Sequence, residues 1–483
     1  MKHFYNFVDG KFNEKIKNTQ IKINPHSLAE DYSFADSDFL DVVSSVQSAH
    51  GAQRIWQELA ADQRQALLEK FAGLITANLN ALAELDAQDT GIPVADAREL
   101  CAQAAQRFSK IIQSDYASQS RYQSRYQLND QAPGREHQLK TPIGIIGIIL
   151  DWQQSILQLC ENLAVSLVCG NLVLLHPSEF SIQSALKLAE LASQAGIPNG
   201  VLNVLLGRGD ELAQSIVEHP GIKCIRFYGE NALGEKLYRA AAENNKRLFM
   251  SLGANNAAII FSDGELCKVV QEVLGLALRF HFYGRNKINR ILVQEKFLPE
   301  FKAQFTAQLN GLFKDQSEDR KLELGLLPSL LHKAKFASYL AQSKKDRAKV
   351  LFGDPEQFSS SADHLSDYRA TPIVYEDLTN CSSLHQESLA GPILFIQSFK
   401  YAHELAKTLN SGSFAHRVYI WTEDASRALR LAQQIEASEI FLNSCSELQS
   451  DFSHSSLKTS GLGQEGIEAM FEFNLNKKLV HLK

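Results

Sequence analysis

The stretch HFYGRNKINR, residues 281–290, lies just before an apolar strand, where a chain of this layout would present an attacking atom. It contains no cysteine, serine or threonine, and its candidates are Arg285 and Lys287. Neither a guanidinium nor an ammonium group is a nucleophile at pH 7. A lysine forms a Schiff base only where burial lowers its pKa. We expect Lys287 to be a solvated or ion-paired loop residue.

Other reactive residues and motifs give weaker signals. Cys224, in KCIRFY, is predicted to be a buried strand residue. No spacing groups His281, His454 and Ser251 into a hydrolytic set, and GRGDEL at 207–212 lacks the third glycine of a dinucleotide fingerprint. The seven cysteines include no C-x-x-C pair. They therefore fit reduced thiols in a cytoplasm better than a disulfide framework, and we expect no metal site.

The elements that must position these residues alternate between helix and strand. Helical spacing covers 38–75 and 76–114, and a polar, tyrosine-bearing segment at 118–138 is predicted to be an exposed hairpin. Short apolar strands then alternate with helices: 143–150, 171–176, 201–206 and 224–228, followed in a second half by 257–261, 290–294, 392–397, 418–422 and 439–443. This order predicts an α/β fold of doubly wound parallel sheets with helices on both faces.

Composition excludes several classes of protein. The 483 residues are 45% hydrophobic and 22% charged, as in soluble globular proteins of two or three domains. A net charge of −6 gives no electrostatic case for binding nucleic acid. The N-terminus has no apolar segment typical of a secretory signal, and the longest apolar runs are too short to span a bilayer. We expect a cytoplasmic protein without a membrane partner.

Six motifs along the chain resemble those of the aldehyde dehydrogenase family. TPIGIIGIILDWQQS is similar to the family's P-x-G-V-x-G-x-I-x-P-W-N-F-P, and GNLVLLHPSE to its G-N-T-V-V-L-K-P-S-E. GIPNGVLNVLLGRG, FYGENALG, ESLAGPI and LKTSGLGQEG resemble four further family segments, all in the family's order. SLGANNAAII and the helical FAGLITANLNALAELDAQDTGIP look most like succinylglutamate semialdehyde dehydrogenases, a branch of arginine catabolism.

The resemblance implies the family's three-part fold. Residues 1–117 and 141–248 should form a Rossmann-like cofactor-type domain, and residues 249–444 a catalytic-type domain. Residues 118–140 and 445–483 should form an oligomerisation arm with a closing β-strand. In the family these pieces join two subunits across a two-fold axis, so we expect a dimer.

The resemblance also assigns catalytic roles, and this chain departs from each of them. The family's cysteine thiolate falls at Arg285, or at Lys287 if a short deletion is allowed, and its general-base glutamate is Ser251. The oxyanion-binding asparagine is Gln153, whose amide lies one bond further out. Cys445, in FLNSCSELQ, is a conceivable substitute thiol but belongs to a different wall of the substrate channel.

The NAD or NADP site implied by the resemblance is altered as well. The cofactor-site positions that carry over are Trp152, His176, Ser178, Glu179, Gly229, Glu230, Gly234 and Ser388. His176 stands for the ribose-binding lysine and can still offer one N–H, whereas Glu230 stands for a serine at the phosphate site and should repel an anion there. Ser388 stands for the second ribose-binding glutamate, and Glu387 beside it should point to the other side. Ala390 stands for the family's phenylalanine.

Three hypotheses follow for the function. The first is an inactive scaffold or regulatory subunit that pairs with itself or with an active paralogue. The second is a working NAD(P)-dependent dehydrogenase of aldehydes or semialdehydes with a displaced nucleophile. The third is a ligand or nucleotide sensor that uses the old crevice. The joint loss of nucleophile, base, amide and cofactor contacts favours a pseudoenzyme with a retained frame.

Overall fold

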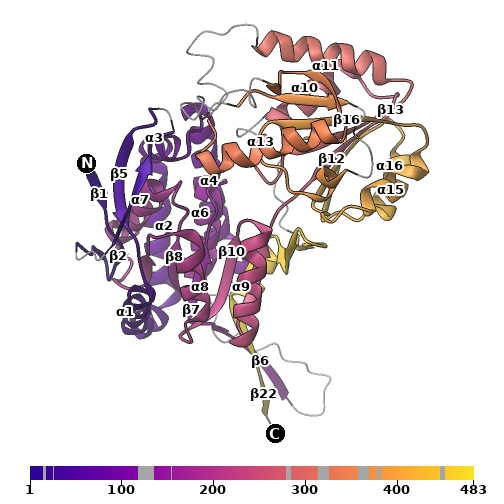
Figure 1. The fold of residues 1–483 in the computed structure, drawn as a ribbon. Coiled ribbons are helices and arrows are strands. Elements are labelled where there is room, and N and C mark those ends of the chain that lie inside the picture. Colours follow the sequence, from indigo (N-terminus) through magenta and orange to yellow (C-terminus); the bar gives the residue numbers. More distant parts are fainter. Residues whose placement is uncertain are drawn as a thin grey trace.

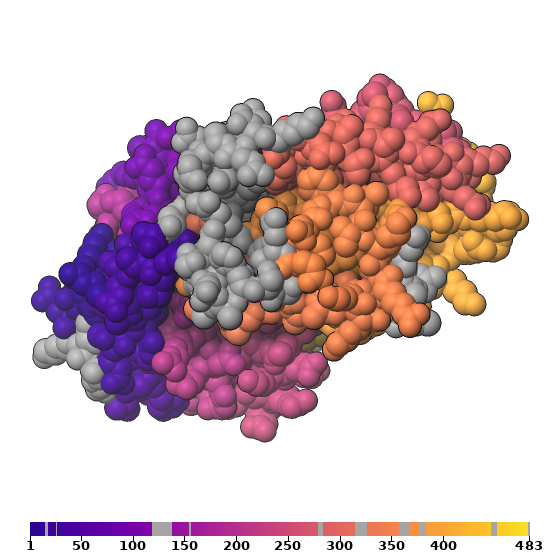
Figure 2. All heavy atoms as spheres, turned by 45° about the horizontal axis from the view of Figure 1, so that its top comes forward, coloured from indigo at the N-terminus to yellow at the C-terminus, as the bar shows by residue number. Residues whose placement is uncertain are grey.

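The computed structural model describes residues 1–14, 18–25, 27–117, 135–153, 155–278, 284–313, 326–356, 368, 370–376, 378, 382–445 and 452–482. Two lobes, each built on a parallel sheet, lie against each other. Figure 1 shows one lobe in indigo to magenta and the other in orange to yellow, and Figure 2 shows them in contact from a second direction. None of the described helices is long and apolar enough to cross a membrane.

The first lobe is an eight-stranded sheet in the order β20-β11-β10-β7-β8-β9-β2-β3, whose central strands are parallel. Its strands are β2 (Phe7–Val8), β3 (Lys11–Phe12), β7 (Ile145–Ile149), β8 (Leu172–His176), β9 (Leu202–Val204), β10 (Ile222–Tyr228), β11 (Arg247–Ser251) and β20 (Gly461–Leu462). Every residue of β7 and β8 is buried, as expected for parallel strands covered on both faces. A small sheet of β1 (Lys2–Phe4), β5 (Glu30–Ala35) and β4 (Thr19–Ile23) stands apart from this one.

Nine helices of the first lobe cover this sheet within the described residues: α1 (Phe39–Glu58), α2 (Ala61–Ala77), α3 (Leu79–Thr90), α4 (Val94–Gln113), α6 (Ser155–Val168), α7 (Ile182–Ala195), α8 (Gly209–Glu218), α9 (Asn231–Glu243) and α17 (Ile467–Phe473). The region that we expected to form two long helices, 38–75 and 76–114, forms four helices, α1 to α4. Asp38 begins α1 by accepting hydrogen bonds from the N–H groups of Leu40 and Asp41, and Pro93 precedes α4. Gly196 ends α7 in the left-handed conformation, as predicted.

The second lobe is a seven-stranded sheet in the order β14-β15-β16-β13-β12-β17-β18, parallel except at the β14 edge. Its strands are β12 (Asn256–Ile260), β13 (Ile288–Gln294), β14 (Lys349–Phe352), β15 (Ile373–Glu376), β16 (Ile393–Phe399), β17 (Arg417–Trp421) and β18 (Glu439–Leu442). Its helices are α10 (Leu266–Leu278), α11 (Leu298–Phe313), α13 (Leu330–Lys345), α15 (Ala402–Asn410), α16 (Ala425–Gln434) and the short 3-10 helix η3 (Ser383–Gln386).

The C-terminal segment contributes strands both to the first lobe and to the projecting arm. β19 (His454–Ser455) pairs with β21 (Gln464–Glu465), and β20 adds to the first sheet beside β11. β22 (Leu475–Leu482) then pairs with β6 (Arg135–Pro142) in an antiparallel ribbon, which projects from the body in Figure 1. The domain boundaries therefore differ from those expected. The first lobe extends to Ser251, the last residue of β11, and β20, within residues 445–483, is part of the first sheet and not of the arm. Residues 118–134 of the expected hairpin lie outside the described residues.

Candidate functional site

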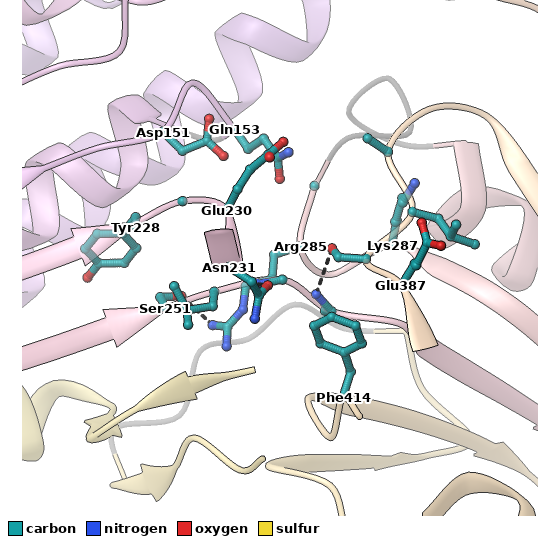
Figure 3. Close-up of a pocket in the computed structure, with 18 of the residues that line it drawn as sticks. Asp151, Gln153, Tyr228, Glu230, Asn231, Ser251, Arg285, Lys287, Glu387 and Phe414 are labelled. Carbon is teal, nitrogen blue, oxygen red and sulfur yellow. Dashed lines mark hydrogen bonds between the residues drawn. The ribbon is translucent and has the colours of Figure 1, made fainter. Parts of the chain in front are cut away.

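A cleft of about 310 Å³ opens between the lobes at the carboxyl ends of β7, β10 and β11, where parallel sheets commonly bind ligands. The start of β13, helix α13 and the segment 386–390 close it from the other lobe. The polar and charged residues that line it include Asp151, Gln153, Glu230, Asn231, Ser251, Arg285, Lys287, Lys335, Glu387 and Ser388 (Figure 3). The sequence-predicted catalytic positions thus share one cavity.

Arg285 is the centre of a hydrogen-bond network that spans the cleft. Its Nη1 donates to Ser251 Oγ at 2.5 Å and to Glu465 Oε1 at 2.6 Å, while Nη2 donates to the carbonyl of Ser460 at 2.6 Å. Figure 3 shows the guanidinium turned toward Ser251. Burial would raise the pKa of the Glu465 carboxyl, but Arg285 outweighs it and holds that pKa below its ordinary value. The two residues that replace thiol and base are therefore bonded to each other.

The described cysteines lie away from the cleft. Cys101, Cys160, Cys169 and Cys224 are buried, and burial raises the pKa of each thiol. Cys445 is half-buried against the core of the second lobe, and Cys267 lies on the surface. No cysteine or histidine lines the cleft in the part of the chain that the structure describes, which does not include Cys381 or His281.

Lys287 was predicted to be a solvated or ion-paired loop residue, and this prediction was wrong. It is 7% exposed, and its Nζ donates to the carbonyl of Gly391 at 2.9 Å. No carboxylate of the described residues lies within ion-pair distance of it. Burial alone lowers the pKa of the ammonium group to about 7. The local sequence GRNKINR is polar, but the fold buries the side chain and gives Nζ a backbone acceptor, the Gly391 carbonyl.

Gln153 and Asp151 line the wall where the family's oxyanion-binding amide would lie. Asp151 accepts a hydrogen bond from the N–H of Trp152 at 2.6 Å, and burial raises the pKa of its carboxyl to about 7, with Glu230 adding to the effect. Trp152 itself is 5% exposed and packs edge-on against Phe180 and His332. It is a core residue between the lobes.

Glu230 stands immediately before α9, but it is not a free anion there as expected. Its carboxylate pairs with Lys335 of α13 at 2.7 Å, which neutralises much of the predicted repulsion. The neighbouring Asn231 accepts a hydrogen bond from the N–H of Gly253 and donates to the carbonyl of Thr459. Gly229 and Gly234 keep the turn into α9, and a Cβ on either would clash with Phe227 or Leu252. The Glu230 side chain makes no capping hydrogen bond to α9 and is 59% exposed, so its carboxylate lies beside this helix N-terminus, paired with Lys335, and does not fill it.

The residues expected to bind ribose are buried or bonded within the protein. His176 is 2% exposed, and burial lowers the pKa of its ring to about 4, so it is a neutral core residue; the N–H that we expected it to offer would have to come from a buried ring. Ser178 Oγ accepts a hydrogen bond from the N–H of Phe180. Glu179 is largely covered, and the charges of Lys22 and Arg208 oppose the rise that burial causes in its pKa.

The segment 387–388, which lines the cleft from the second lobe, is held by hydrogen bonds. Ser388 Oγ accepts from the N–H of Ala254 at 3.1 Å, and Tyr339 donates to the Ser388 carbonyl at 3.3 Å. Glu387, expected to point away, lines the same cleft as Ser388.

A smaller cavity of about 80 Å³ also borders Arg285, and several of the side chains that line it are charged. Arg107 pairs with Glu161 at 2.8 Å, and Arg417 pairs with Glu439 at 2.6 Å. An aldehyde approaching Arg285 from this side would have to displace hydrogen-bonded ion pairs.

Residues 12–480 match the model of the aldehyde dehydrogenase family. The chain belongs to the aldehyde dehydrogenase family. It is 28% identical to the 2-hydroxymuconic semialdehyde dehydrogenase of Pseudomonas sp. (strain CF600), over 100% of both chains. It is 26% identical to the NADP/NAD-dependent aldehyde dehydrogenase PuuC of Escherichia coli (strain K12), over 95% of this chain and 91% of that one.

A solved structure of an aldehyde dehydrogenase has the same fold. The crystal structure of an NAD-dependent aldehyde dehydrogenase from Sinorhizobium meliloti covers 100% of this chain and 95% of that one, with a TM-score of 0.91 and 27% identity. The expected fold is therefore confirmed, and relatives in this family use NAD or NADP. Neither named relative is a succinylglutamate semialdehyde dehydrogenase, so the branch assignment stays a hypothesis.

Sequence reasoning missed four residues that shape this aldehyde dehydrogenase site. Glu465 and Ser460 lie in LKTSGLGQEG, a segment singled out only as a family motif. Asp151 stands where the family motif has proline, a departure that was visible in DWQQS. Lys335 follows Glu230 by 105 residues on a helix with no family signature, and no signal in the sequence pairs the two.

Replacing Glu230 by serine is expected to lower the Kd for NADH by about tenfold, equivalent to about 1.4 kcal/mol. The substitution removes the carboxylate from the N-terminus of α9 and frees Lys335 for a phosphate. Isothermal titration calorimetry at a fixed salt concentration measures the Kd for NADH of the wild type and the variant. The matched control is Lys335→Ala, which leaves Glu230 unpaired and should weaken NADH binding. Equal affinities for the wild type and Glu230→Ser would contradict this view of the cleft.

Proposed function

We propose that this family member does not oxidise aldehydes by the thiol route and instead works as a ligand-binding protein through the cleft between its lobes. One observation carries the proposal. Arg285, one of the two residues that the family alignment places at the thiol position, is hydrogen-bonded to Ser251, the residue expected at the position of the base. A guanidinium cannot attack a carbonyl, and among the described residues the hydrogen bond of Ser251 Oγ is to a cation, Arg285, and not to a base that could take a proton from water.

The retained cleft supports a binding role. Its volume of about 310 Å³ is of the size of a small-molecule site, and its polar groups come from both lobes. A ligand that touches both walls would stabilise the folded protein by mass action. We expect a concentration-dependent rise in Tm with small carbonyl compounds and no formation of NADH. A flat Tm across NADH, ADP-ribose and a panel of aldehydes would contradict the binding role.

The second candidate function is a working dehydrogenase with a displaced nucleophile. The names of the relatives favour it, since both are dehydrogenases. Turnover that disappears when one cysteine is changed to serine would establish it and identify the thiol.

We also propose that the chain self-associates through its arm. β22 pairs with β6 along eight residues, from Leu475 opposite Pro142 to Leu482 opposite Arg135, and the ribbon leaves the body with strand edges available for pairing. The partner is a second copy, and a mixed dimer with an active paralogue is the alternative that co-expression would detect.

Truncation after residue 475 is expected to convert a dimer into monomer or aggregate, because it removes β22 and leaves β6 without its partner strand. Light scattering at micromolar concentration measures the mass. Lys477→Ala is the control within the strand: it removes only an exposed ion pair with Glu472 and should leave the dimer intact. A monomeric full-length protein would exclude self-association through the arm.

A further inference from the structure

The cleft contains two lysines in different states. Lys335 is paired with Glu230, 2.7 Å away, and its side chain is 36% exposed. Lys287 is 7% exposed, and the Gly391 carbonyl is its hydrogen-bond acceptor, with no carboxylate of the described residues within 4 Å of Nζ. A buried ammonium without a counterion is costly, so the fold favours the neutral amine at this position.

We infer that Lys287 captures the carbonyl group of an aldehyde as a reversible imine in the cleft between the lobes. The inference rests on the proposed function, because it names the class of ligand that the cleft holds. The Lys287 side chain lines the cavity that carries the positions expected to react in this family. The side chain is 7% exposed, and the carbonyl of Gly391 accepts a hydrogen bond from Nζ and so orients it.

The charged and titratable groups that face the cleft decide how the amine behaves. The acids are Asp151, Glu230 and Glu387, and the cations are Arg285 and Lys335. Tyr228 and Tyr339 also line it. Glu230 and Arg285 are neutralised by their own partners, Lys335 and Glu465. The state of Lys287 is thus set by burial, which lowers the pKa of its amine to about 7.

The reaction balances without an oxidant. The lone pair of Lys287 Nζ attacks the carbonyl carbon, a C–N bond forms, and the C=O electrons move to oxygen, which takes a proton. The carbinolamine then loses this oxygen as water, giving C=N. Glu387 lines the same part of the cleft as Lys287 and can carry the proton that water needs (Figure 3). Water reverses the sequence, so the adduct is a binding state and no hydride is transferred.

Lysine capture differs from the family's thiol chemistry in its outcome. A thiohemiacetal passes a hydride to NAD(P)+, whereas the carbon of a protonated imine is itself an electrophile and keeps its hydrogen, because loss of hydride from it would leave a nitrilium ion. Lys287 therefore makes the site a holder of carbonyl compounds, consistent with the loss of the cofactor contacts at Glu230 and His176.

Reductive trapping tests the inference. The full-length protein is mixed at pH 7 with propanal or succinic semialdehyde, treated with sodium cyanoborohydride, digested and analysed by mass spectrometry. Lys287 should gain the mass of the aldehyde less one oxygen, at a rate at least tenfold above that of Lys335. At pH 7 an amine of pKa about 7 is about 10³ times more often neutral than an ordinary lysine. The rate at Lys287 should rise from about pH 6 to pH 8 and then level.

Two variants control the trapping experiment. Lys287→Met should lose the modification at this position while Lys335→Met keeps it, and circular dichroism shows whether each variant is folded. If Lys287→Met does not fold, Lys287→Gln keeps an uncharged hydrogen-bond donor for the Gly391 carbonyl and still cannot form the imine. Modification of Lys335 or surface lysines at equal or higher rates, or of no lysine, would overturn the inference. NADH formation in parallel samples would contradict the proposed function separately.

Discussion

Replacing Arg285 by alanine is expected to lower the free energy of unfolding by about 2–4 kcal/mol. The change leaves Glu465 without its cation and Ser251 without a donor. Removing one partner of a fully buried ion pair costs about 3–5 kcal/mol. The side chain of Glu465 is 24% exposed, so we place the expected cost below that range. Urea denaturation measures it through the midpoint at constant m-value.

Two controls separate the ion pair from a general effect of losing arginine. Arg239→Ala removes an exposed arginine, 77% accessible and 3.9 Å from Glu235, and should change stability by no more than about 0.5 kcal/mol. Arg285→Ala combined with Glu465→Gln should recover part of the loss, because no unpaired carboxylate is left. Full additivity of the two changes would show that the pair is not coupled.

The stability difference between wild type and Arg285→Ala should also depend on pH. Arg285 lowers the pKa of Glu465 in the folded protein, so its contribution is present above the unfolded-state pKa of about 4.3. It is lost as the pH falls through the folded-state pKa. The two unfolding curves should therefore converge in acid. A difference that stays constant down to about pH 3 would assign the effect to packing.

Restoring only the thiol is expected to leave oxidation absent: Arg285→Cys should show no NAD(P)+-dependent turnover above wild type. Ser251 supplies no base, and a general base contributes about 10²–10⁴ in rate. Gln153 stands for the oxyanion amide, whose loss costs about 10²–10³. Together these deficits predict a rate at least about 10⁴ below that of an intact site. A stopped-flow assay of NADH with propanal measures it.

The matched variant adds the base, Arg285→Cys with Ser251→Glu. It should be at least tenfold faster than Arg285→Cys alone, since thioester hydrolysis then has a base. If the single variant turned over as fast as the double, the site would hold a base that its described residues do not reveal. Both variants lose the Arg285–Glu465 pair, so their folding must be checked at the assay temperature.

Much of the fold could be predicted because it depends on local patterns. The apolar runs that became β7 and β8 are continuous because both strand faces are buried, and Gly196 marked the end of α7. The helical region before residue 114 was placed correctly but divided only near residue 75, since its further breaks at Leu59–Ala60 and at Pro93 interrupt the apolar spacing only briefly. β20 is two residues long and pairs across more than 200 positions, so no pattern could reveal it.

The candidate site shows where reasoning from sequence ends. The family frame placed the thiol position at Arg285 or Lys287, but it did not reveal the partners of Arg285, because Ser251 and Glu465 lie 34 and 180 residues away. Glu230 was expected to be an unpaired anion because Lys335 has no link to it along the chain. The environment of Lys287 was wrongly predicted for the same reason: Gly391, whose carbonyl accepts its hydrogen bond, is 104 residues away. Residue types follow from local comparison, whereas charge states depend on tertiary neighbours.

The central claim is that this aldehyde dehydrogenase fold holds ligands without oxidising them. A single-turnover experiment tests it most directly: wild-type protein at tens of micromolar is mixed with excess NAD+ or NADP+ and an aldehyde, and NADH or NADPH fluorescence is followed for an hour. We predict no increase above the protein-free control, because one turnover per site would already be visible. A burst of reduced cofactor equal to the protein concentration, abolished by changing one cysteine to serine, would contradict the account.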